Sequence, residues 1–194
     1  MKNKRFAFLT IITVTLSLIF FVAHQSYKKD EGRKSSEIYS QVLAYRPLFE
    51  AKNFLTDCLS HQRKLLISSE SNIFLTSQGK SWQEVSTFDL QQIQNSTWRD
   101  FSQTNSIVSN FPSDLSLGCE YTLVDLKNYE SVQSSDCPII MLSKIGLNKT
   151  KNQALVLLSQ SCGQNIWLTL FLLDLVNGHW HVTDAVSPPV SFTY

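Results

Sequence analysis

The stretch that decides the fold is Ile166-Trp-Leu-Thr-Leu-Phe-Leu-Leu-Asp-Leu-Val176, followed by Asn177-Gly178 and then His179-Trp-His-Val182. Asn-Gly between two β-prone runs predicts a type I′ hairpin, because that turn needs positive φ at both central positions. A two-residue loop fixes the register. Val176 is therefore expected to face His179, Leu175 Trp180, Asp174 His181 and Leu173 Val182.

Alternation along these strands puts apolar side chains on both faces. One face is predicted to carry Trp167, Thr169, Phe171, Leu173, Leu175, Trp180 and Val182. The other is predicted to carry Ile166, Leu168, Leu170, Leu172, Asp174, His179 and His181. A strand that is apolar on both faces is typical of the middle of a sheet covered on both sides. The run 153–161 is expected to pair with it through a turn at 162–165, which places Leu158 opposite Thr169 and Val156 opposite Phe171. Residues 139–147 are expected to add a further strand.

The N-terminus carries an apolar run. Residues 6–23 contain no charge, and as a helix they would be about 27 Å long, enough to cross the hydrocarbon core of a bilayer. Lys2, Lys4 and Arg5 precede the run, so residues 1–5 are expected to be a cytoplasmic tip and the rest of the chain to be exported. We predict an uncleaved transmembrane anchor. The alternative is a signal sequence whose cleavage releases a secreted protein.

The middle of the chain predicts helices and short strands. Residues 24–35 read as a charged linker, and residues 36–194 as one extracytoplasmic α+β domain. The expected fold is a membrane helix, then helices packed on one face of an antiparallel sheet that ends in a β-meander. Its expected first helix is capped by Ser35 or Ser36 and ends near Tyr45 or restarts beyond Pro47, with a second helical piece at 50–61. Strands are expected at 64–68 and 71–76, joined by a short polar turn, and at 120–125. A further helix is expected at 87–104, broken at Asn95, with Ser96 as the cap after the break.

A pattern spread over roughly residues 39–182 resembles a set of exported bacterial proteins of unassigned function. It comprises Ser143-Lys-Ile-Gly-Leu-Asn148, Gln153-Ala-Leu-Val156, Cys162-Gly163 and Gly178-His-Trp-His-Val182. Those proteins typically carry Ser-Arg-Val-Gly-Phe-Asn in the first element and a second Cys-Gly, which this chain lacks. The resemblance implies an extracytoplasmic α+β domain and brings no activity. The closing strand also looks like the end of nuclear-transport-factor-2-like domains.

All four cysteines follow the apolar run. An even number of Cys in an exported chain predicts two disulfides, with three possible pairings. We expect Cys119–Cys137, closing the loop between two neighbouring strands, and Cys58–Cys162 by remainder. The alternatives are a metal or redox site, although the chain has no Cys-x-x-Cys, and Cys162 as a nucleophile. In a reducing compartment, all four would instead be buried thiols.

The closing hairpin also holds a candidate metal site. His179 and His181 are two residues apart on a strand, so both point the same way, and Asp174 opposite His181 would supply a carboxylate. The competing interpretation is a polar strand end that faces solvent, with Trp180 and Val182 turned into the core.

Charge and motifs narrow the class of function. Residues 28–194 carry fourteen Lys and Arg against sixteen Asp and Glu, a net charge of −2, so no nucleic-acid partner is expected. The chain has no phosphate-binding Gly-rich loop and no Gly-x-Ser-x-Gly motif, and we expect no cofactor. The favoured interpretation is a membrane-anchored, extracytoplasmic, non-catalytic binding or assembly module. Its expected partners are the membrane, through residues 6–23, and an extracytoplasmic protein. The alternatives are a metal-dependent hydrolase using His179, His181 and a carboxylate, and an accessory subunit that folds fully only with its partner.

Overall fold

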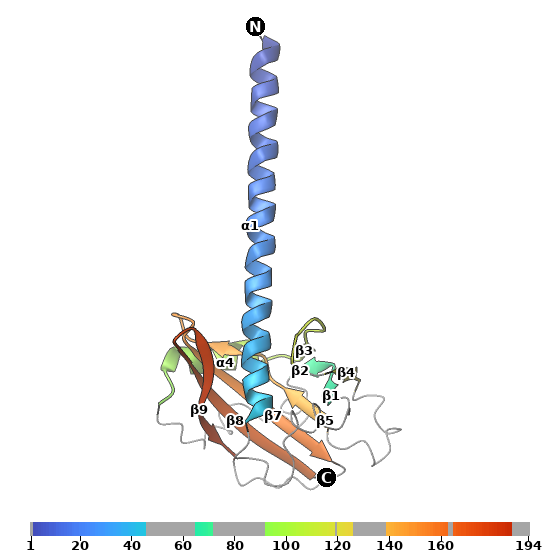
Figure 1. The fold of residues 1–194 in the computed structure, drawn as a ribbon, viewed down its shortest axis with the longest axis vertical. Coiled ribbons are helices and arrows are strands. Elements are labelled where there is room, and N and C mark those ends of the chain that lie inside the picture. The colour runs from blue at the N-terminus through green and yellow to red at the C-terminus, as the bar shows by residue number, and fades with distance from the viewer. Residues whose placement is uncertain are drawn as a thin grey trace.

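A single long helix stands on a sheet domain (Figure 1). The structure is a computed structural model of the 194-residue chain. The backbone is described for residues 2–45, 65–71, 92–118, 120–125, 139–162 and 165–187; the side chains of residues 2–14, 161, 162, 165 and 166 are not described. The predicted helical segment at 50–61 lies outside these residues, as do 72–76 and 87–91.

The main sheet has seven strands and mixed pairing. Its order is β4 (Tyr121–Val124), β1 (Leu65–Ser68), β5 (Ile139–Leu142), β7 (Gln153–Cys162), β8 (Asn165–Val176) and β9 (His179–Val186), with β6 (Gly146–Leu147) also paired to β7. β1 runs parallel to both β4 and β5. The prediction of a purely antiparallel sheet is therefore wrong, because β1 enters between two strands that come later in the chain.

The hairpin that ends the sheet follows the predicted register. Val176 pairs with His179, Leu175 with Trp180, Asp174 with His181 and Leu173 with Val182. Asn177 and Gly178 both have positive φ, at 53° and 83°, as a type I′ turn requires. The predicted pairs Leu158–Thr169 and Val156–Phe171 are also confirmed. Local turn chemistry and alternation thus specified the β7–β8–β9 meander.

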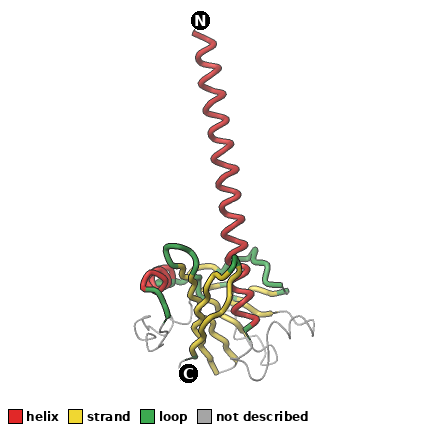
Figure 2. Tube along the Cα trace, turned by 60° about the vertical axis from the view of Figure 1, so that its left-hand side comes forward, coloured by secondary structure: helices red, strands yellow, loops and turns green. Residues whose placement is uncertain are grey.

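Helices cover both faces of this sheet, whereas the sequence predicted helices on one face. The C-terminal part of α1 (Lys2–Ala44) packs into one core with Val156, Phe171 and Trp180. Phe101 of α4 (Asn95–Thr104) packs into a second core with Leu155, Leu157, Leu168, Leu170 and Leu172 on the other face. Figure 2 shows α4 and the lower part of α1 on opposite sides of the strands. β8 is apolar on both faces because each face of the sheet is covered by its own helix.

α1 is longer than predicted. It runs without interruption through residues 24–35, which were expected to be a linker, so neither Ser35 nor Ser36 caps a new helix. The helix ends at Ala44, as the Pro47 argument required, and Tyr45 packs edge-on against Phe171 with 5.7 Å between ring centroids. Salt bridges from Asp30 to Arg33 and Lys34 lie at helical spacing, which supports helix where polarity alone suggested a loop.

The short elements also depart from prediction. β2 (Glu70–Ser71) pairs antiparallel with β3 (Ser109–Asn110) in a separate two-stranded sheet and does not fold back on β1. α4 begins at Asn95, so Ser96 lies inside the helix and does not cap it. The predicted strand 139–147 is divided into β5 and β6, whereas the predicted strand at 120–125 is confirmed as β4.

Candidate functional site: the junction of the long helix and the sheet

At the junction of α1 and the β8–β9 hairpin, the first described helix contacts the last described strand. The Glu37 carboxylate accepts a hydrogen bond from the backbone N–H of Trp180 at 3.0 Å. The Trp180 side chain is buried in the same core as Ile38, Val42 and Leu43 of α1. A hydrogen bond from a backbone N–H to a charged acceptor is stronger than one to a neutral acceptor. α1 is therefore held on β9 both by apolar packing and by a directional hydrogen bond.

A second contact lies further along the helix. The hydroxyl of Tyr39 donates to the backbone carbonyl of Ser143 at 2.9 Å, while the Ser143 hydroxyl accepts from the N–H of Leu157 at 2.8 Å. Tyr39 is buried, and burial raises the pKa of its hydroxyl far above the ordinary value. Glu37 and Tyr39 thus attach α1 to two different parts of the sheet, which holds the helix at a fixed angle.

A polar network on the opposite face holds α4. The side-chain oxygen of Gln153 accepts from the N–H of Gln94 and from the Thr97 hydroxyl, both at 2.8 Å. Its amide nitrogen donates to Asp174 and to the carbonyl of Gln92, both at 3.2 Å. Gln153 therefore ties β7 to the start of α4, whose N-cap residue Gln94 makes no side-chain capping bond of its own. This network is structural, because its polar atoms bond to one another.

The predicted metal residues do not converge. Asp174 and His181 are cross-strand partners, but the Asp174 carboxylate accepts from Gln153 and, at 2.9 Å, from the Thr183 hydroxyl. His179 is 77% exposed and lies 3.7 Å from Glu37, which is bonded to Trp180. Within the described part of the chain, no three His, Cys, Asp or Glu residues are placed to hold a metal ion. This arrangement favours the interpretation of a polar strand end beside the turn.

The predicted disulfides fall largely outside the described residues. Cys58, Cys119 and Cys137 lie there, and Cys162 is described only as a backbone partner of Asn165. The reason for preferring Cys119–Cys137 no longer holds, since β1 separates β4 from β5 and these strands are not neighbours. The pairing stays a prediction.

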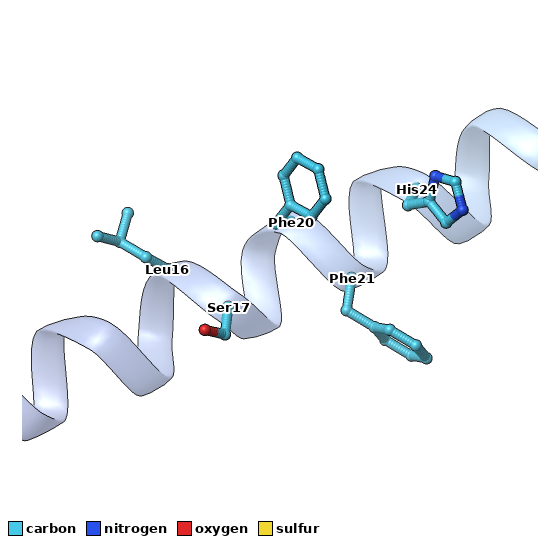
Figure 3. A pocket seen from close by; sticks show the side chains of 5 residues that line it. All are labelled: Leu16, Ser17, Phe20, Phe21 and His24. Atoms are coloured by element: carbon cyan, nitrogen blue, oxygen red, sulfur yellow. The ribbon is translucent and has the colours of Figure 1, made fainter.

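The upper part of α1 exposes apolar side chains on every side. Leu16, Leu18, Ile19, Phe20, Phe21 and Val22 are each between 56% and 76% exposed. A shallow hollow beside them is lined only by α1 residues, and Phe20 and Phe21 point to opposite sides of the helix (Figure 3). Seven consecutive helical residues, 16–22, cover almost two turns, so this apolar surface encircles the helix.

The span of α1 and the comparison with known proteins give two further findings. Among the residues whose side chains are described, which in α1 begin at Thr15, no helix is both long and apolar enough to span a membrane. No protein family, curated protein or solved structure matches the chain. The resemblances noted above therefore stay predictions.

Sequence reasoning missed the residues that build the junction. Neither residue was a candidate, because Glu37 lies just after the charged segment 24–35 in no motif and Gln153 is the first residue of the predicted strand 153–161. A weak signal existed for Gln153, because it is a polar residue at the start of an otherwise apolar strand. No local signal marked Glu37, whose partner is 143 positions away.

Proposed function

We propose that the protein is a membrane-anchored, extracytoplasmic binding or assembly module without catalytic activity. The observation that supports this most is the division of α1 into two surfaces. Its upper part exposes apolar side chains all round, whereas Ile38 and Val42 near its end are 1% and 0% exposed within the domain core. A helix that is apolar on all sides is stable in lipid or in a protein core, and no described element covers this one.

The mechanical consequence is a rigid attachment. Since α1 passes from the apolar run into the core as one helix, the sheet domain cannot swivel on a linker. The bonds at Glu37 and Tyr39 fix its angle. Such a module would present one defined face of the domain to partners at a set height above the membrane.

Basic residues flank the apolar run on both sides. Lys2, Lys4 and Arg5 precede it without an acidic residue. After it, Arg33 and Lys34 are both paired with Asp30. Lys28 and Lys29 also follow the run, so three basic residues precede it and four follow it; the count of Lys and Arg does not by itself set the orientation, which stays a proposal.

A candidate contact residue for a protein partner is Trp167. Its side chain is 50% exposed near the start of β8, at the opposite end of that strand from the Asn177-Gly178 turn. Trp is enriched among residues that dominate binding at protein interfaces. Trp167→Ala would therefore lower affinity for such a partner while leaving the core residues unchanged.

The anchor is tested on the full chain in its native membrane. We expect the protein to remain in the pellet after carbonate washing, and protease to digest the domain only from the extracytoplasmic side. Phe20→Lys with Phe21→Lys should release it, because each Lys costs roughly 3 kcal/mol near the middle of a membrane helix and somewhat less towards its end. The matched control is Tyr27→Lys, which is exposed but beyond the apolar run. A wild-type protein in the supernatant, or one lacking its first residues by mass, would contradict the anchor.

A further inference from the structure

One loop of the domain reaches back to α1 just after the apolar run ends. Lys151, in the loop between β6 and β7, lies with its amine 3.7 Å from a Glu31 carboxylate oxygen and 5.6 Å from the centre of the Tyr27 ring. The hydroxyl of Tyr27 also bonds to Glu31. The domain therefore touches α1 four to eight residues beyond Ala23.

The helical rise per residue converts this spacing in sequence into a distance along α1 from the end of the apolar run. At about 1.5 Å per residue, Tyr27 is about 6 Å and Glu31 about 12 Å beyond the end of the apolar run. The headgroup layer extends roughly 5–8 Å beyond the hydrocarbon on each side of a bilayer. If residues 6–23 span the membrane as proposed, the Lys151 loop lies at the outer edge of that layer.

Basic residues gather at this height. We define the basic collar as Lys28, Lys29, Arg33, Lys34, Lys149 and Lys151. With Asp30 and Glu31, its only acidic neighbours in residues 24–36, the segment and loop carry a net charge of +4. The remaining residues of 28–194 have eight Lys and Arg against fourteen Asp and Glu, a net charge of −6. Basic charge is thus concentrated at the base of the anchor.

Half of the collar is not neutralised by a neighbour. Asp30 binds Lys34 and Arg33, which lower the pKa of its carboxyl, and Glu31 lies beside Lys151. Lys28, Lys29 and Lys149 are exposed and form no ion pair among the described residues. Exposed amines on both the helix and the loop would face the same lipid surface.

We propose that the basic collar binds the anionic phospholipid headgroups of the membrane that holds α1. This rests on the proposed anchor and adds a second membrane contact, the Asn148–Asn152 loop of the domain. Each Lys near an anionic surface contributes about 1 kcal/mol, within a Debye length of roughly 10 Å at 0.1 M salt. The contact would hold the domain with its β6–β7 loop toward the lipid and leave the distal end of the sheet free.

The test is lysine acylation of the full-length protein in lipid nanodiscs, read residue by residue by mass spectrometry. Discs of zwitterionic phospholipid are compared with discs that also contain anionic phospholipid. We expect Lys149 to react about fivefold more slowly in the anionic discs, the equivalent of about 1 kcal/mol. The difference should disappear at 1 M salt, where the Debye length is about 3 Å.

Lys144 is the internal control. Its neighbour Ser143 bonds to Tyr39, which is twelve residues, or about 18 Å, further down α1 than Tyr27. Its reactivity should be the same in both discs. Equal reactivity of Lys149 in both discs, with the protein still in the carbonate-washed pellet, would overturn the collar and leave the anchor intact. Release by carbonate would overturn both.

Discussion

Glu37 and Trp180 are 143 positions apart, yet the carboxylate of the first accepts the backbone N–H of the second at 3.0 Å. The bond joins the helix that leaves the domain to the strand that closes its sheet. Because Trp180 is itself buried beside Ile38 and Val42, the directional bond and the apolar contact reinforce one another. The chain therefore couples its long N-terminal helix to its last described strand.

The first prediction concerns this bond. Glu37→Ala should lower the free energy of unfolding by about 1.5–3 kcal/mol, because a hydrogen bond to a charged group is lost and a backbone N–H is left without a partner. Urea unfolding of the full chain in detergent measures the change. Glu31→Ala, which removes only exposed contacts with Lys151 and with the Tyr27 hydroxyl, should cost less than about 1 kcal/mol. Equal effects of the two variants would contradict this role for Glu37.

The second prediction concerns close packing between α4 and β6. A Cβ atom on Gly146 would lie 2.5 Å from the Cα atom of Phe101 and closer still to its Cβ atom. Backbone must therefore move, and Gly146→Ala should destabilise by about 2 kcal/mol or more. Gly32 is the matched control, since nothing lies within 4 Å of its added Cβ. Gly32→Ala in the middle of α1 should stabilise by about 0.5–1 kcal/mol. Thermal unfolding of both variants would show opposite shifts, and shifts of the same sign would refute the packing argument.

The third prediction is a dependence of stability on alkaline pH. Burial raises the pKa of Tyr39, so the folded chain keeps this proton after the unfolded chain has lost it. The contribution is complete below about pH 10, the unfolded value, and is lost as pH rises above it. The free energy of unfolding should thus fall by up to about 1.4 kcal/mol per pH unit from this group.

The variant Tyr39→Phe isolates the contribution of the Tyr39 hydroxyl to this pH dependence. The variant should lose about 1 kcal/mol at pH 7, where the bond to Ser143 is removed, and should show a shallower decline between pH 10 and 11. Tyr27→Phe, at an exposed position, should leave the slope unchanged. Parallel pH profiles for wild type and Tyr39→Phe would show that Tyr39 is not the group responsible.

The fourth prediction distinguishes the proposed binding module from the alternative function, a metal-dependent hydrolase. His179 and His181 share one side of β9, but Asp174 is occupied by Gln153 and Thr183. We expect calorimetric titration with Zn²⁺ to show no stoichiometric site, and His181→Ala to leave the titration unchanged. A one-to-one site that disappears in His181→Ala would instead support metal-dependent hydrolysis.

Local patterns in the sequence determined the parts of this protein that depend on near neighbours. The Asn177-Gly178 turn set the register of β8 and β9, because backbone preference at two residues fixes every pair that follows. The apolar residues on both faces of β8 correctly predicted that it lies inside the sheet, where it is between β7 and β9, and Pro47 limited the end of α1. The uncharged run 6–23 was equally plain.

Only the tertiary structure decided the long-range relationships. Insertion of β1 between β4 and β5 made the sheet mixed, and no residue near Leu65 encodes the direction of a strand it meets far along the chain. Residues 24–35 are helical because the helix is anchored by Glu37, Tyr39 and the core beyond them, which outweighs their polar composition. The metal site stays a prediction, and the hydrogen bonds that compete for its carboxylate also come from the tertiary structure. The spacing of His179 and His181 on β9 places both side chains on one side of the strand. The hydrogen bond from Gln153 of β7 to the Asp174 carboxylate could not be predicted from local sequence.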